Sequence, residues 1–221
     1  MKRNIITLLI TVFAMLQATA QTYDNLWKQA DIIAQKDQPK SEIGVMKKII
    51  SKATAAKDYG QLLAAEIRQA ILWREISPDS LTPNVKRMET EALKAKDPVL
   101  KAVRYAVLGK VYREVNGKKS EEFFRKALEQ PELLARNAST GYVPLTLKGV
   151  DGSSFKNDLL HLIGFEADSK EAYHLMYTYY NKVGNRGAAC LCAYKLIEKY
   201  RQDDVREVRK SKYLNTIDSL I

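Results

Sequence analysis

The chain has 221 residues, two cysteines and a formal net charge of +10 at pH 7. A chain of this length can bury about 70% of its unfolded surface, so one or two domains can fold without disulfide bonds. The basic residues are spread along the sequence and do not form a stripe interleaved with aromatic side chains, so we predict no nucleic-acid partner.

The first twenty residues have the pattern of a secretory signal peptide. Lys2 and Arg3 precede an apolar run over residues 5–16, and Ala18 and Ala20 are the small residues that a signal peptidase accepts. The run is too short to anchor stably across about 30 Å of hydrocarbon, and no later stretch is apolar enough to do so. We therefore predict a signal peptide over residues 1–20, cleavage after Ala20, a periplasmic or secreted location, and no membrane span after leader removal.

Residues 21–136 are predicted to form an N-terminal helical half. Apolar side chains recur there every three or four residues, and no alternating run is long enough to indicate a strand. The predicted helices cover residues 23–35, the stretch that follows Pro39 to residue 57, residues 60–75, and three further helices that begin near residues 82, 97 and 120.

Capping residues suggest where the later helices of this half begin and end. Thr82 and Asp97 each precede a proline, which favours an N-cap followed by proline at the first helical position. The helix after Asp97 is apolar on more than one face, so we expect it to be the most buried. Asn116-Gly117 predicts a left-handed cap at its end, and Ser120 predicts the start of the next helix.

The helical pattern lapses between residues 137 and 154, where glycine and proline recur. We predict a long loop or short hairpin there, with a short extended segment over residues 143–150, and treat it as the boundary between two helical halves. Residues 155–221 are predicted to form the C-terminal helical half, with helices over residues 157–165, 170–183, 186–200 and 203–220.

The predicted architecture is all-α. Residues 105–128 and 175–196 each combine two helical patterns, an Asn-Gly or Gly-Asn turn and small residues that allow close helix contact, as in a tetratricopeptide unit. The full consensus of that repeat is absent and the spacing is uneven. We therefore predict an irregular array of antiparallel helical hairpins that is tetratricopeptide-like.

The sequence contains no recognisable arrangement of catalytic, cofactor-binding or metal-binding residues. His161 and His174 are the two histidines, and we expect Asp158 to accept an N–H of His161 one turn later. Cys190 and Cys192 diverge by about 200° on a helix, so they cannot bridge each other and are expected to be packing residues. The acidic residues are predicted to lie on solvent faces. We predict that the protein is not an enzyme and binds no cofactor.

Four tyrosines mark a candidate partner-binding groove. Tyr173, Tyr177 and Tyr180 form one stripe with Met176 on a predicted helix, and Tyr194 lies on the next helix. Such a stripe can bind a peptide or glycan in an aromatic groove. It can equally be inter-helix packing, in which the rings are buried and the hydroxyl groups stay hydrated.

Several segments, taken in order, resemble the N-terminal helical region of large bacterial alpha-2-macroglobulin-like proteins. The resemblance covers essentially the whole chain after the leader. It is carried by TYDNLWKQ at 22–29, ISPDSL at 76–81, DPVLKAV at 97–103, LGKVY at 108–112, NDLLHLIG at 157–164, TYYNKVGNR at 178–186 and YLNTIDSL at 213–220.

The resemblance implies a role beside a protease-inhibitor system. Members of that family continue into β-sandwich macroglobulin domains that resemble protease traps, whereas this sequence contains neither those domains nor a thioester Cys-x-Glu-Gln motif. We therefore expect a non-catalytic exported docking or accessory module whose partner in the envelope is a macroglobulin-type domain or a protease. The alternative is an independent envelope scaffold that binds a peptide, glycan or envelope protein.

Overall fold

A computed structural model describes residues 22–207 except residues 78, 80, 114, 144 and 146–150, and this part of the chain is all-α, as the sequence predicts. It contains helices and no named strand. The helices are α2 (Tyr23–Ala34), α3 (Pro39–Ala56), α4 (Tyr59–Ile76), α5 (Leu81–Lys94), α6 (Pro98–Tyr112), α7 (Gly117–Ala127), α8 (Pro131–Ala135), the 3₁₀ helix η2 (Ser139–Tyr142), α9 (Leu159–Ala167), α10 (Lys170–Lys182) and α11 (Arg186–Glu207).

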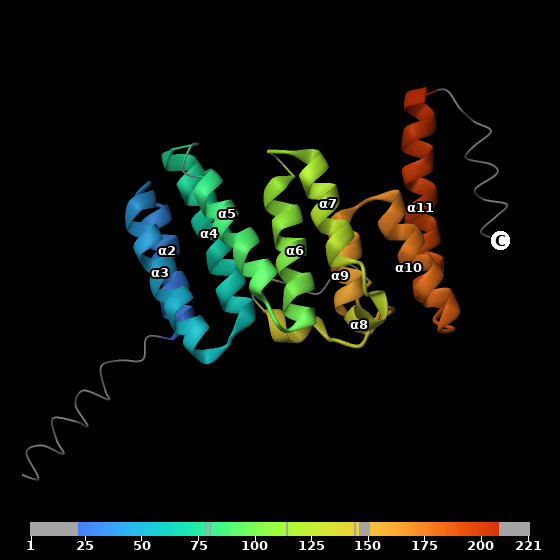
Figure 1. The fold of residues 1–221 in the computed structure, drawn as a ribbon, viewed down its shortest axis with the longest axis horizontal. Helices are drawn as coiled ribbons and strands as arrows, with labels where there is room; N and C mark the ends of the chain where they lie inside the picture. The colour runs from blue at the N-terminus through green and yellow to red at the C-terminus, as the bar shows by residue number, and fades with distance from the viewer. Residues whose placement is uncertain are drawn as a thin grey trace, which may run out of the picture.

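The helices lie side by side along the long axis of the molecule (Figure 1). Helices α2 to α5 form one end, α6 and α7 lie in the middle, and α10 and α11 form the other end. The most extensive contacts join helices that follow one another in the chain: α3 with α4, α6 with α7, and α10 with α11. None of the helices within the described ranges is long and apolar enough to cross a membrane.

The middle of the array is the most deeply buried. Every residue of α6 from Ala102 to Gly109 is buried, as its apolar pattern predicts. The larger hydrophobic cluster runs from Leu63 in α4 to Leu196 in α11 and so draws side chains from both sides of the 137–154 segment. A smaller cluster, which includes Leu26 and Met46, joins α2, α3 and the outer face of α4.

Side-chain caps explain where several helices begin. Asp97 accepts the backbone N–H groups of Val99 and Leu100, so the predicted cap of α6 is confirmed. The prediction for Thr82 is wrong, because α5 already begins at Leu81 and Thr82 lies inside it. Pro83 still falls in the first turn, where its missing N–H removes no intrahelical hydrogen bond.

The predicted left-handed end of α6 at Asn116-Gly117 is also wrong. Asn116 has an extended backbone with φ −155°, and its side chain accepts the N–H of Lys119, so it caps the start of α7. Gly117 is the first residue of α7. Ser120 therefore lies inside α7 and does not begin it. The error arises because asparagine serves at either end of a helix, and only the backbone angle decides which.

The 137–154 segment packs against α4 through the 3₁₀ helix η2 and is closed by a backbone bridge just before α9. The backbone N–H of Ser139 donates to the carbonyl of Asn157 over 2.9 Å, and that of Leu159 donates to the carbonyl of Asn137 over 2.9 Å. Ala138 and Asp158 thereby form an isolated antiparallel bridge. The described residues between them include the 3₁₀ helix η2, whereas most of the predicted extended segment 143–150 lies outside the described residues.

The last helix differs from its prediction. Helix α11 runs without a break to Glu207, so the predicted interruption between residues 200 and 203 is wrong. No glycine or proline stands there to end the helix. The rest of the predicted 203–220 helix and the predicted signal peptide at 1–20 lie outside the described residues.

Candidate functional site

A groove with a volume of about 230 Å³ lies between α4 and α6 and is the candidate site of this protein. We call it the α4–α6 groove. Its lining comes from one stripe of α4 and from the last turn of α6 with the residue that follows: Ile67, Ala70, Ile71, Arg74, Lys110, Val111 and Arg113.

The floor of the groove is apolar. Ile67, Ala70 and Ile71 lie at positions i, i+3 and i+4 of α4, so they share one face of that helix. Ala70 is buried, and Ile67 and Val111 are half-buried against the larger hydrophobic cluster. The same stripe continues one turn further to Arg74, which is exposed. The helical spacing therefore places a cation directly beside an apolar surface.

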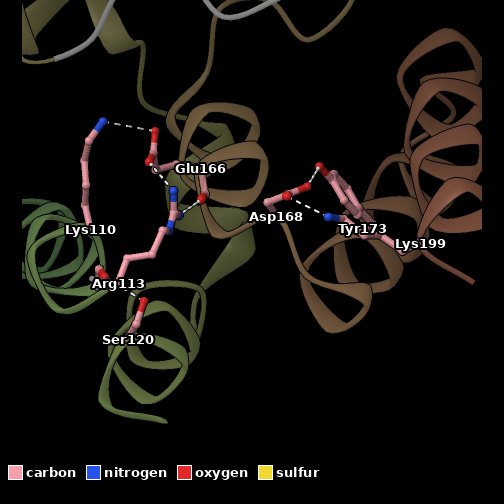
Figure 2. Close-up of polar contacts among 8 residues, drawn as sticks. Lys110, Arg113, Ser120, Glu166, Asp168, Tyr173 and Lys199 are labelled. Atoms are coloured by element: carbon pink, nitrogen blue, oxygen red, sulfur yellow. Dashed lines mark hydrogen bonds and ion pairs between the residues drawn. The ribbon is translucent and has the colours of Figure 1, made fainter. Parts of the chain in front are cut away.

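The rim of the groove is basic and is partly held in place by Glu166, near the end of α9 (Figure 2). The Nζ of Lys110 lies 3.4 Å from one carboxylate oxygen of Glu166, and a guanidinium nitrogen of Arg113 lies 3.1 Å from the other. Arg113 also donates to the backbone carbonyl of Glu166. The last carbonyl groups of a helix carry partial negative charge, so this contact complements the end of α9.

A close contact between α6 and α7 fixes the turn that carries these cations. A Cβ atom on Gly109 would lie 2.7 Å from the ring of Phe124, closer than real Cβ contacts, so only glycine fits at this point. The hydroxyl of Ser120 donates to the carbonyl of Gly109 over 2.6 Å (Figure 2). The guanidinium of Arg113 also lies over the Phe124 ring, 5.4 Å from its centre.

Asp168 joins α9 to the last two helices (Figure 2). It caps the end of α9 with φ 50° and accepts hydrogen bonds from the hydroxyl of Tyr173 over 2.8 Å and from Lys199 over 2.6 Å. Burial acts to raise the pKa of Asp168, but the hydrogen bonds from Lys199 and Tyr173 outweigh it and lower that pKa. The pKa of Tyr173 is raised by burial and by this carboxylate. The contacts hold three helices together.

Asp158 is a second carboxylate with a structural role. It caps the start of α9, where it accepts the backbone N–H of His161 over 2.8 Å and the hydroxyl of Tyr180. Burial raises the pKa of Asp158 to about 6, against the opposing effect of these hydrogen bonds. His161 is fully buried, and its ring stacks on Phe155 with 3.9 Å between ring centres. His174 is exposed on α10.

The four tyrosines of the predicted groove do not line one open surface. Tyr173 and Tyr180 are each 2% exposed and belong to the larger hydrophobic cluster. Tyr177 is half-buried against the same cluster, whereas Tyr194 is 56% exposed on α11. The hydroxyl groups of Tyr173 and Tyr180 donate to the carboxylates of Asp168 and Asp158, which allows both rings to pack inside the array.

The two cysteines are free, with Cys190 exposed and Cys192 buried, so they do not bridge each other. Burial, followed by the charge of Asp158, raises the pKa of the Cys192 thiol to about 12. Because the thiolate is the reactive form, Cys192 is unreactive at neutral pH. Among the described residues no group of three or more metal-ligating side chains comes together.

The prediction that acidic residues lie on solvent faces is wrong for Glu42, Glu66 and Asp158, which are all buried. Glu66 is 3% exposed and binds Arg87 over 3.2 Å and Arg104 over 3.3 Å, while Glu42 binds Arg68 over 2.6 Å. The sequence holds a signal for this burial, because Glu66 follows Leu62 and Leu63 at helical spacing on the apolar side of α4. A carboxylate at such a position requires a cation nearby.

Comparison of the chain with models of protein families, with curated proteins and with solved structures gave no match. The function is therefore argued from the geometry of the fold and of the α4–α6 groove.

Proposed function

We propose that this chain is a non-catalytic helical docking module that binds a protein partner through the α4–α6 groove. The observation that carries the proposal is the groove itself, in which an apolar floor lies beside basic side chains held by neighbouring helices. Apolar surface supplies affinity to a protein contact, and charges at its edge supply orientation and selectivity.

The perturbed side chains elsewhere support a binding role over a catalytic one. Asp158 and Asp168 cap the two ends of α9 and accept hydrogen bonds from Tyr180 and Tyr173. These four groups fasten α9 to α10, so their shifted pKa values have a structural cause. The pairing of consecutive helices further supports a tetratricopeptide-like hairpin array, an architecture that offers an extended binding surface.

The resemblance to the N-terminal helical region of alpha-2-macroglobulin-like proteins gives the proposal its setting. It indicates an exported protein that docks a macroglobulin-type domain or a protease in the envelope. On this basis the protein neither hydrolyses substrates nor inhibits proteases by itself. Incubation with a panel of proteases is expected to leave their activity unchanged and to form no adduct with Cys190 or Cys192.

Position-specific photo-crosslinking tests the docking site. A photoreactive phenylalanine analogue is placed at Ile71 in the groove, at Ile32 on α2 as an exposed control, or at Tyr194 on α11. We expect one protein of the envelope fraction to be crosslinked from position 71 and not from position 32. Crosslinking from 194 alone would favour the alternative scaffold surface, and equal crosslinking from all three positions would contradict a defined site.

A further inference from the structure

The size of the α4–α6 groove limits what it can hold. Its volume of about 230 Å³ lies below the roughly 300–1,000 Å³ that is typical of sites for small molecules and cofactors. Its lining is a short strip on each of two helices, with an apolar floor formed by Ile67, Ile71 and Val111. A space of this kind fits one anchoring apolar side chain of a longer ligand.

The charges around the groove select the chemistry of that ligand. Arg74, Lys110 and Arg113 surround the floor, and Glu166 is the carboxylate in contact with two of them. Within the described residues Arg74 forms no ion pair with a carboxylate, and its side chain is exposed. The rim therefore keeps an excess of positive charge beside an apolar surface, and a ligand with carboxylate groups complements it.

The protein itself shows which group this rim accepts. The carboxylate of Glu166 uses one oxygen for Lys110 and the other for Arg113, with distances of 3.4 Å and 3.1 Å. The side chain of Glu166 is 36% exposed, and those of Lys110 and Arg113 are 56% and 42% exposed, so water reaches all three. Exposed ion pairs are weak, so a carboxylate from a ligand can compete with Glu166 at little cost.

We infer that the α4–α6 groove binds an acidic peptide segment, which inserts one apolar side chain between α4 and α6 and places a neighbouring carboxylate on Arg74, Lys110 and Arg113. This inference rests on the proposed docking function and names the chemistry of the partner. The Glu166 carboxylate occupies two of the three cations in the free protein and competes with the carboxylate of the ligand.

A random heptapeptide library displayed on phage tests the inference with the purified protein. Selection is expected to enrich peptides in which aspartate or glutamate stands within two positions of leucine, isoleucine, valine or phenylalanine. The enriched sequences are then synthesised with a fluorescein label, and their affinity is measured by fluorescence anisotropy. The affinity should fall as salt concentration rises, because exposed charges are screened.

Three charge variants separate a specific rim from general electrostatic attraction. Arg74→Glu removes an exposed ion pair, worth up to about fivefold in affinity, and adds a repulsive carboxylate, so it should weaken binding of the enriched peptide by about fivefold. Arg201→Glu, at an exposed arginine of α11, makes the same change in net charge and should leave affinity within about twofold. Glu166→Gln removes the internal competitor and should strengthen binding by about two- to fivefold.

The outcomes distinguish this inference from the proposed function. Enrichment of peptides without acidic residues, no enrichment at all, or equal weakening by Arg74→Glu and Arg201→Glu would overturn the inference. Binding to phosphatidylglycerol vesicles that is lost in Arg74→Glu, without peptide enrichment, would assign the rim to a membrane surface instead. A partner crosslinked from position 71 through a segment that lacks acidic residues would retain docking and reject the acidic ligand.

Discussion

The hydroxyl of Tyr180 lies 2.9 Å from each carboxylate oxygen of Asp158, inside the core of the helical array. This contact joins α10 to the first turn of α9 and to the backbone bridge that closes the 137–154 segment. Asp158 is 5% exposed, and burial raises the pKa of its carboxyl group from an ordinary value of 3.8 to about 6.

The raised pKa of Asp158 predicts a pH-dependent stability. The folded protein binds the Asp158 proton more tightly than the unfolded chain does. The stability that this proton contributes is therefore complete below about pH 3.8 and is lost as pH rises through 6. The free energy of unfolding of the wild type minus that of Asp158→Asn should fall by on the order of 2 kcal/mol between pH 4 and pH 7. Urea titrations at several pH values measure it. A difference that rises over this range would show that the hydrogen bonds dominate.

Gly109 should tolerate no added side-chain atom. Gly109→Ala places a Cβ atom 2.7 Å from the Phe124 ring and forces α6 and α7 apart, which should cost about 1–3 kcal/mol of stability. Gly44→Ala is the matched control, since nothing lies within 4 Å of its added atom in the middle of α3. That change should stabilise the protein by about 0.5–1 kcal/mol. Thermal unfolding of both variants checks the prediction, and shifts of the same sign would contradict it.

The buried carboxylate of Glu66 should be essential only while Arg104 is present. Glu66→Met leaves the nearly buried guanidinium of Arg104 without this carboxylate, which should cost about 3–5 kcal/mol. The double variant Glu66→Met with Arg104→Met should recover most of that loss. Glu122→Met, at an exposed pair with Lys126, should cost less than about 1 kcal/mol. Urea unfolding gives all three values, and equal costs at positions 66 and 122 would refute the prediction.

The two cysteines should differ sharply in reactivity. Cys190 is exposed, whereas Cys192 is buried and its thiol has a pKa of about 12. Iodoacetamide at pH 8 should modify Cys190 in the folded protein and modify Cys192 only after unfolding, because the thiolate is the attacking form. Mass spectrometry of the digested protein locates the modification. Rapid modification of Cys192 in the folded state would show that α11 opens readily.

The fold class and several helix positions follow from local sequence signals. The N-cap at Asp97 and the long apolar pattern that follows it predict α6, because both signals depend only on residues that are close together in the sequence. Whether Asn116 ends α6 or begins α7 could not be predicted in the same way, because this depends on its backbone angles in the folded protein. The partners of Tyr173 and Tyr180 could not be predicted either. The spacing of the two tyrosines indicates one face of a helix, while the carboxylates that bind their hydroxyl groups come from opposite ends of α9.

The sequence indicates the apolar stripe of the candidate site but not its basic rim. Ile67, Ala70 and Ile71 form a recognisable stripe, but periodicity alone assigns such a stripe to the core. In the structure this stripe lies at the edge of the contact with α6, where Ile67 and Ile71 stay half-exposed. The basic side chains of the rim come from α4 and the end of α6, and Glu166 contacts them from α9. The arrangement of the rim therefore depends on tertiary packing that no single segment specifies.

The bridge between Ala138 and Asp158 fixes where α9 starts. Two backbone hydrogen bonds hold residues 137 and 139 to residues 157 and 159, so the chain enters α9 beside α8. Tyr142 and Phe155, which lie between these points, are buried in the larger hydrophobic cluster. Closure entropy alone would tolerate a longer segment, since doubling the length of a flexible loop costs only about 0.6 kcal/mol. An insertion that leaves both rings in place should therefore spare the α4–α6 groove and its Glu166 contact, whereas one that displaces either ring should disturb them.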